Sequence, residues 1–134
     1  MKRILVVEDD KNVALALTVR LRSEGYEPSV AYDATSVVPT ANKNRPDLIL
    51  MDISMPGGGG LVAARRLRNL APLATIPVIV LTASRKPELR EEAMAVGAIA
   101  FFEKSYEAQD LMAAIAKALQ PETSEALAVP ALSA

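Results

Sequence analysis

Short apolar runs that alternate with longer stretches of helical periodicity constrain the fold of this chain more than any other feature. Three runs, at 4–7, 48–51 and 78–81, consist only of aliphatic residues and methionine. Continuous runs of this length are typical of parallel strands that are buried on both faces of a sheet. Two weaker runs, at 29–32 and 99–102, complete a set of five predicted strands.

The segments between these runs have the spacing of helices. Val13, Leu17 and Leu21 recur at four-residue intervals and predict a helix over 12–23. Four more helices are predicted at 34–42, 61–70, 87–96 and 107–119. The second of these contains Pro39, which predicts a kink or a late start of that helix.

Five strand–helix units in series indicate an α/β protein. Parallel neighbours in a sheet need crossover helices, and such crossovers are right-handed. We therefore predict a flavodoxin-like, doubly wound sheet of five parallel strands in the order 2-1-3-4-5, with five helices. This domain is expected to span residues 1–120. Residues 121–134 are rich in Pro, Ala, Ser and Thr, which favours a disordered tail or the start of a linker.

The composition excludes several kinds of chemistry. The chain contains neither Cys nor His, which excludes disulfides, thiolate zinc sites and catalytic triads based on His. The net charge of −1 gives no general attraction to nucleic acids or anionic membranes. No apolar run approaches the roughly 20 residues that a membrane span needs, and the N-terminal run is too short for a signal peptide. We expect a cytoplasmic protein without a nucleic-acid or membrane partner.

Polar residues follow four of the predicted strands. The acidic run 8–10 follows the first strand, Asp52 ends the third, Thr82 the fourth, and Lys104 comes shortly after the fifth. Ligands of open parallel sheets bind beyond the carboxyl ends of the strands. We therefore expect these side chains to share one pocket.

Crowded carboxylates in such a pocket suit a metal ion and phosphoryl chemistry. They repel one another unless a cation joins them, and their hard oxygen atoms suit Mg²⁺. A carboxylate such as Asp52 can attack a phosphoryl group and form an aspartyl phosphate. Lys104 could pair with a phosphate oxygen and Thr82 could donate a hydrogen bond to another. The simpler alternatives are that Asp9 or Asp10 only caps the following helix, and that Thr82 and Lys104 are ordinary loop residues.

Two further features have competing interpretations. Arg65, Arg66 and Arg68 lie on one predicted helix, and a solvated basic face is favoured over nucleic-acid binding. The glycines at 57–60 lack the Lys-Ser/Thr that would follow in a phosphate-binding P-loop. A mobile loop beside the site is the better interpretation of these glycines.

Four motifs, in this order and spacing, closely resemble the response-regulator receiver domains of bacterial two-component systems. The resemblance covers about residues 3–119. The motifs are Ile4-Leu5-Val6-Val7-Glu8-Asp9-Asp10, Asp52-Ile53-Ser54-Met55-Pro56 with Gly60, Leu81-Thr82-Ala83 and Phe102-Glu103-Lys104.

The resemblance implies a role for seven residues and a Mg²⁺ cofactor. Glu8 and Asp9 would be the metal-binding pair, Asp52 the phosphorylated residue and Ser54 a metal ligand through its backbone carbonyl. Thr82 would move its hydroxyl onto the phosphate, Lys104 would pair with the phosphate, and Phe101 falls at the switch aromatic position. Plain core packing is an equally good interpretation of Phe101.

Three positions bear on how this chain would differ from its family. The family usually has Pro after the Lys, often with a cis peptide bond, and this chain has Ser105. The loop after Lys104 is therefore expected to differ in geometry. Ser54 and Ser84 stand where the family tunes dephosphorylation, and neither offers an amide or carboxylate to position a water molecule. We therefore expect slow loss of phosphate.

The resemblance predicts a phosphorylation-dependent signalling switch rather than an ordinary enzyme. A sensor histidine kinase or phosphotransfer protein would supply the phosphoryl group, and the chain would assist its own phosphorylation and dephosphorylation. The face formed by the fourth helix, fifth strand and fifth helix would then change its affinity for a partner. The downstream effector is unknown, and the sequence does not decide whether the chain forms a homodimer.

Three rival functions stay open at this point. The first is an interaction module with the same fold and no phosphorylation. The second is a phosphatase with an Asp nucleophile, although Ser54 stands where such enzymes usually carry a second acid. The third is a flavin-binding protein, which is disfavoured because the first loop is acidic where a phosphate cradle is rich in Ser and Thr.

Overall fold

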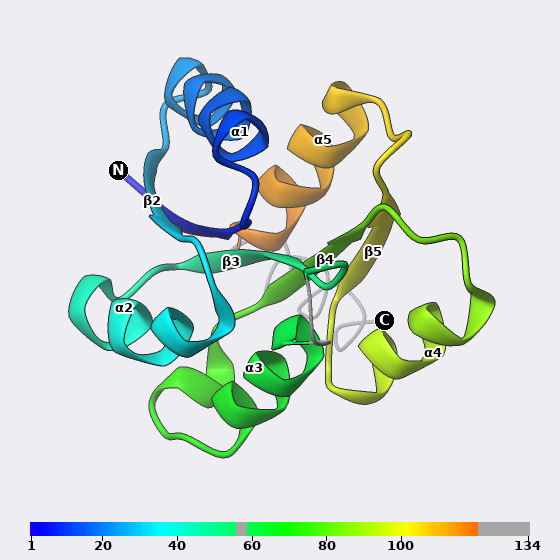
Figure 1. Ribbon diagram of the computed structural model, residues 1–134. Coiled ribbons are helices and arrows are strands. Elements are labelled where there is room, and N and C mark those ends of the chain that lie inside the picture. Colours follow the sequence, from blue (N-terminus) through cyan, green and yellow to red (C-terminus); the bar gives the residue numbers. More distant parts are fainter. Residues whose placement is uncertain (56–58, 121–134) are drawn as a thin grey trace, which may run out of the picture.

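The computed structural model describes residues 1–55 and 59–120 (Figure 1). The five strands are β1 (Arg3–Val7), β2 (Glu27–Ala31), β3 (Leu48–Asp52), β4 (Val78–Thr82) and β5 (Ala100–Glu103). The five α-helices are α1 (Lys11–Ser23), α2 (Val37–Asn44), α3 (Gly59–Arg68), α4 (Pro87–Ala95) and α5 (Ala108–Ala118). Two 3-10 turns, η1 (Ala34–Ser36) and η3 (Leu73–Thr75), precede α2 and β4. The predicted tail or linker at 121–134 lies outside the described residues.

The strands form one parallel sheet in the order β2-β1-β3-β4-β5. The predicted fold class and strand order are therefore confirmed. Helices α1 and α5 cover one face of the sheet, and α2, α3 and α4 cover the other (Figure 1). The described residues include no helix with the length and apolar character to span a membrane.

Alternate residues of β1 show how both faces of the sheet are buried. Ile4 and Val6 belong to an apolar cluster with residues of α1 and α5. Leu5 and Val7 belong to a second cluster with residues of α2 and α3. All four side chains are almost completely buried, which is the reason for the uninterrupted apolar run.

Strand β2 begins at Glu27, two residues before the predicted start, and includes Pro28. The strand lies at an edge of the sheet and pairs only with β1. Proline is tolerated on an edge strand because one side of the strand needs no ladder hydrogen bonds. The strand is also only partly buried, so its apolar pattern is weak.

Helix α2 starts late, as the position of Pro39 predicted. Asp33 accepts a hydrogen bond from the Ser36 backbone N–H at 2.9 Å and caps the preceding turn η1. The α-helix then begins at Val37, so Pro39 falls in its first turn. A missing N–H is harmless there because the first N–H groups of a helix have no partner within the helix.

Helix α3 begins at Gly59, inside the glycine run and two residues before the predicted start. A Cβ atom at Gly60 would lie 2.5 Å from the carbonyl oxygen of Asp52 and 2.7 Å from the Cα atom of Ile53. Gly60 therefore allows the first turn of α3 to approach the end of β3. The rest of the predicted mobile loop, residues 56–58, lies outside the described residues.

The prediction of a solvated basic face on α3 is wrong for Arg68. Arg65 and Arg66 are exposed, but Arg68 is partly buried and donates hydrogen bonds to three backbone carbonyls. The sequence pattern does not distinguish these arginines because two of the acceptors, the carbonyls of Val96 and Gly97, lie 28 and 29 positions from Arg68.

Candidate functional site

Three carboxylates converge at the carboxyl ends of β1 and β3. Oxygen atoms of Glu8, Asp9 and Asp52 all lie within 4.8 Å of one another. Glu8 and Asp52 are buried, with exposed fractions of 1% and 2%, and Asp9 is exposed. The structure thus brings the acidic pair and Asp52 together, as their positions after adjacent strands predict.

Asp10, the third residue of the acidic run, has a structural role. Its carboxylate accepts hydrogen bonds from the backbone N–H groups of Asn12 at 2.9 Å and Val13 at 3.1 Å. It is therefore the N-cap of α1. This decides which of the two aspartates caps the helix and leaves Asp9 with the metal-ligating set.

Lys104 joins the two buried carboxylates. Its Nζ atom donates to Glu8 Oε1 at 2.7 Å and to Asp52 Oδ2 at 3.0 Å. The Lys104 backbone N–H donates to the Thr82 carbonyl at 2.7 Å, which ties the residue after β5 to the end of β4. The ammonium group is thereby held over the pocket and supplies a positive charge to both acids.

Ser54 has a role at Asp52 that the sequence did not reveal. Its backbone N–H and its hydroxyl both donate to Asp52 Oδ1, at 2.8 Å and 2.6 Å. The same hydroxyl oxygen accepts from the Ala83 backbone N–H at 3.3 Å, so it connects Asp52 to the loop after β4. A hydroxyl residue two positions after an aspartate favours such a local turn, and this was the available signal.

The pKa values of the two buried acids shift in opposite directions. Burial raises the pKa of Glu8 to about 7, against the hydrogen bond from Lys104, and the neighbouring Asp52 adds to the rise. Burial also acts to raise the pKa of Asp52, but hydrogen bonds from Ser54 and Lys104 outweigh it and lower that pKa. Asp52 is therefore ionised at neutral pH, as a nucleophile must be.

Among the described residues, the Thr82 hydroxyl forms no hydrogen bond with the carboxylates of the site, and the Phe101 side chain has no group that could form one. Thr82 is fully buried, and its hydroxyl oxygen accepts from the Ser84 backbone N–H at 3.0 Å. Phe101 is half-buried against the core, and the Arg90 guanidinium lies 5.7 Å from its ring centre.

The loop after Lys104 passes through Ser105 and is held by an aromatic contact. Tyr106 packs edge-on against Phe102, with ring centres 5.8 Å apart and planes inclined at 71°. Lys104 reaches both carboxylates with Ser105 in place of the usual proline.

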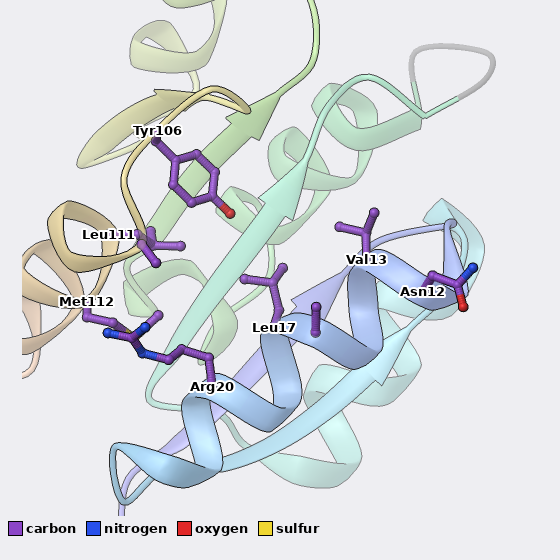
Figure 2. Close-up of a pocket in the computed structure, with 9 residues that line it drawn as sticks. Asn12, Val13, Leu17, Arg20, Tyr106, Leu111 and Met112 are labelled. Carbon is purple, nitrogen blue, oxygen red and sulfur yellow. The ribbon is translucent and has the colours of Figure 1, made fainter.

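An apolar groove of about 440 Å³ lies between α1 and α5, next to the site. Figure 2 shows the side chains that line it, among them Val13, Leu17, Tyr106, Leu111 and Met112. Burial raises the pKa of the Tyr106 hydroxyl, and the charges of Lys104 and Glu8 also act on it. Tyr106 thus connects the groove with the charged pocket.

The donor set of the pocket fits a small divalent cation. Three carboxylates supply hard oxygen atoms, which are the ligands that Mg²⁺ prefers. The raised pKa of Glu8 reflects burial and the crowding of negative charge, which a cation relieves. The exposed position of Asp9 leaves one side of the cluster accessible to solvent.

Known proteins with related sequences carry the same domain. The response regulator receiver domain family matches residues 4–116. The phosphate regulon transcriptional regulatory protein PhoB of Klebsiella pneumoniae is 37% identical over 114 residues, which are 85% of this chain and 50% of PhoB. The transcriptional regulatory protein PdtaR of Mycobacterium tuberculosis is 36% identical over 115 residues, 85% of this chain and 55% of PdtaR. The chain spans about half the length of these relatives.

Solved structures agree with this match. A CheY-like receiver domain protein of Methanospirillum hungatei has a TM-score of 0.84 and 27% identity, covering 93% of this chain and 98% of its own. The chemotaxis protein CheY4 of Vibrio cholerae has a TM-score of 0.82 and 28% identity, covering 89% of this chain and 99% of its own. The family match includes all or most of each of the five strands and five α-helices that the structure describes. The chain therefore belongs to the response regulator receiver domain family, the signalling domain of two-component systems.

Proposed function

We propose that this chain is a phosphorylation-dependent switch in which Asp52 accepts a phosphoryl group from a sensor histidine kinase or a phosphotransfer protein. The bridge from Lys104 Nζ to both Glu8 and Asp52 is the observation that carries the proposal. This bridge places the positive ammonium group of Lys104 beside the ionised Asp52 at the carboxyl ends of the strands. Such an arrangement supports attack on a phosphoryl group and neutralises the charge of the product.

The transfer replaces one bond to phosphorus with another. An oxygen of Asp52 attacks phosphorus in line with the bond to the donor imidazole. That phosphorus–nitrogen bond breaks and its electron pair stays on the nitrogen, and a proton on the other ring nitrogen makes the departing group a neutral imidazole. Lys104 would then pair with an oxygen of the new phosphate instead of the free carboxylate.

Glu8, Asp9 and Asp52, together with the backbone carbonyl of Ser54, would hold Mg²⁺ in this pocket. The ion, when bound, supplies positive charge that offsets the phosphoryl oxygens. The convergence of the three carboxylates supports this assignment. The Ser54 carbonyl comes from the resemblance of the Asp52–Met55 motif to the family.

The new phosphate would shift the domain between two states. Thr82 would turn its hydroxyl from the Ser84 N–H toward a phosphate oxygen, and Phe101 would rearrange with the loop after β4. Two observations support this proposal: Thr82 ends β4, and Phe101 pairs with Val80 of the same strand. The change is a population shift that new charge drives.

The face of α4, β5 and α5 would transmit this change to a partner. Met94 and Ile99 expose apolar side chains beside β5, with exposed fractions of 45% and 49%. A contiguous exposed apolar surface is typical of interaction sites, and these two side chains would contribute to such a surface on this face. The partner can be an effector or a second copy of the chain.

We also propose that the receiver domain spans residues 1–120 of a cytoplasmic protein, with 121–134 as a tail or linker.

Phosphate incorporation with acetyl phosphate and Mg²⁺ tests this function in the 134-residue chain. The unmodified chain is expected to take up close to one phosphate per molecule, and Asp52→Ala to take up none. Asp110→Ala, which removes an exposed acid in the first turn of α5, is the matched control and should label normally. Normal labelling of Asp52→Ala, or no Mg²⁺-dependent labelling of the unmodified chain, would contradict the proposal.

A further inference from the structure

We infer that α4 acts as a lever, a helix that pivots about one fixed end. Arg68 holds the C-terminal end in place, and Ser84 connects the N-terminal end to Thr82. The inference concerns how α4 is attached to the rest of the domain. Its link to phosphorylation rests on the proposed function of Asp52.

Arg68 fixes the C-terminal end of α4 to α3. Its Nε donates to the Val96 carbonyl at 2.9 Å, and its Nη2 donates to the Gly97 carbonyl at 2.6 Å. Its Nη1 donates to the Ala74 carbonyl at 2.6 Å, so the same guanidinium also holds the segment before β4. A guanidinium is well suited to this position because it carries positive charge to the negative end of the helix dipole and offers several donors in a rigid plane.

Gly97 makes this attachment geometrically feasible. A Cβ atom at this position would lie 2.7 Å from Arg68 Nε and 3.0 Å from its Cζ. The backbone of Gly97 also adopts a φ of +89°, a conformation that glycine accepts most readily. The end of α4 and the Arg68 side chain are thus fitted to each other over 29 positions of sequence.

The rest of α4 is attached much less firmly. Within the helix only Ala93 is buried, and Leu89 is partly buried against the core. Lys86 occupies the N-cap position and provides no side-chain cap for the first turn. Few buried apolar contacts mean that this end can open at a small cost in free energy.

Two hydrogen bonds connect the N-terminal end of α4 to Thr82. The Thr82 hydroxyl oxygen accepts from the Ser84 N–H at 3.0 Å. The Ser84 hydroxyl oxygen in turn accepts from the Lys86 N–H at 3.3 Å, directly before the helix. Ser84 is therefore held by Thr82 on one side and holds the start of α4 on the other.

Loss of the Thr82 acceptor should release one end of α4 and spare the other. When the Thr82 hydroxyl turns toward a phosphate, the Ser84 N–H loses its partner and the Lys86 contact loses its support. The three bonds from Arg68 do not involve Thr82 or Ser84 and persist. The helix then rotates about its C-terminal end, and the displacement is greatest near Pro87.

Hydrogen–deuterium exchange of backbone amides in the full chain tests the lever without phosphorylation. Thr82→Val removes the hydroxyl and keeps the side-chain shape, and Thr82→Ser is the control that restores the hydroxyl. In Thr82→Val we expect exchange over 84–90 to rise about fivefold, the effect of losing one hydrogen bond, with no change over 96–98. Thr82→Ser should return the exchange over 84–90 to that of the unmodified chain.

Arg68→Gln tests the hinge, and Arg66→Gln on the exposed side of α3 is its matched control. In Arg68→Gln, exchange over 96–98 should rise at least about fivefold, and the added Thr82→Val change should then spread along the whole helix. Equal exchange changes at both ends of α4 in Thr82→Val alone would overturn the lever. So would an Arg68→Gln variant in which the two ends still respond differently to Thr82→Val.

Beryllofluoride with Mg²⁺, a stable mimic of the phosphoryl group, separates failure of the lever from failure of the proposed function. The lever stands if Thr82→Val loosens only the N-terminal end of α4, whether or not beryllofluoride binds. A chain that behaves in this way and ignores beryllofluoride contradicts the proposed function alone. A chain that binds beryllofluoride and loosens at both ends of α4 contradicts the lever alone.

Discussion

The ammonium group of Lys104 lies 2.7 Å from a carboxylate oxygen of Glu8, although 96 positions of sequence separate the two residues. The fold brings them together because β1 and β5 are parallel strands whose carboxyl ends point to the same edge of the sheet. Glu8 is buried and Lys104 partly exposed, so the pair is only partly screened by solvent. Lys104 also forms an ion pair with Asp52, so one ammonium group offsets the charge of two buried acids.

Removal of the Lys104 ammonium group should destabilise the metal-free chain. Lys104→Gln leaves Glu8 and Asp52 without a countercharge, and we expect a loss of about 2 kcal/mol in the free energy of unfolding at pH 8, discounted for the partial exposure of Lys104. Urea denaturation in the presence of a chelator measures the loss. Mg²⁺ should recover much of it. Lys117→Gln on the exposed side of α5 is the control, and an equal loss in both variants would count against the role of Lys104.

The raised pKa of Glu8 predicts a pH dependence of stability. The pKa of Glu8 is about 7 in the folded chain, above the ordinary value of 4.5. The stability that the protonated Glu8 side chain contributes is therefore fully present below about pH 4.5 and is lost as the pH rises through 7. Glu8→Gln should therefore stabilise the metal-free chain at pH 8 by about 2 kcal/mol and have little effect at pH 5. The lowered pKa of Asp52 acts only in more acidic solution.

Urea denaturation at both pH values, with chelator present, measures this difference between Glu8→Gln and the unmodified chain. Glu103→Gln, an exposed acid at the end of β5, is the control and should show no such trend. A Glu8→Gln variant that is less stable than the unmodified chain at pH 8 would show that the Lys104 contact outweighs the burial of this charge.

The close approach of α3 to Asp52 should make Gly60 intolerant of a side chain. Gly60→Ala places a methyl group 2.5 Å from the Asp52 carbonyl oxygen, so the backbone of β3 or α3 must move. We expect a loss of about 2 kcal/mol in stability and slower phosphorylation by acetyl phosphate. Gly25→Ala is the control, since its Cβ would meet no atom within 4 Å and only its φ of +92° is unfavourable. Equal phosphorylation rates in the two variants would show that Gly60 does not position Asp52.

Loss of phosphate from Asp52 should be slow, because neither Ser54 nor Ser84 offers an amide or carboxylate to position a water molecule. Ser54→Asn introduces such a group beside Asp52 and should speed hydrolysis at least about tenfold. Ser54→Ala removes only the hydroxyl and is the control, with a half-life within about threefold of the unmodified chain. Retention of labelled phosphate over time measures both. Similar rates for the unmodified chain and Ser54→Asn would contradict slow loss.

The central strands and the strand-end residues of the site could be predicted from the sequence because their physical causes are local. Strands β1, β3 and β4 are buried on both faces, so every residue in their apolar runs reports burial. Parallel strands also place their carboxyl ends together, which brings Asp52 near Glu8 without further information. The predicted start of the edge strand β2 is wrong by two residues because the strand is only partly buried and its apolar pattern is weak.

The contacts made by Ser54 and Arg68 could not be predicted in the same way. The hydroxyl of Ser54 lies against Asp52 because of the turn after β3, and a serine in a loop has many other local partners. Arg68 contacts Val96 and Gly97 because the C-terminal ends of α3 and α4 lie next to each other. That arrangement depends on loop lengths rather than on residue type. The sequence contains these residues but no periodic signal that connects them.

Chemical trapping of the phosphorylated residue tests the central claim most directly. The full chain is phosphorylated with acetyl phosphate and Mg²⁺ and then reduced with borohydride, which converts an aspartyl phosphate to homoserine. Mass spectrometry of the digested protein then locates the change. We predict homoserine at position 52, dependent on Mg²⁺ and on the phosphodonor. Homoserine at another aspartate, or a phosphate that resists borohydride, would contradict the assignment of Asp52 as the phosphate acceptor.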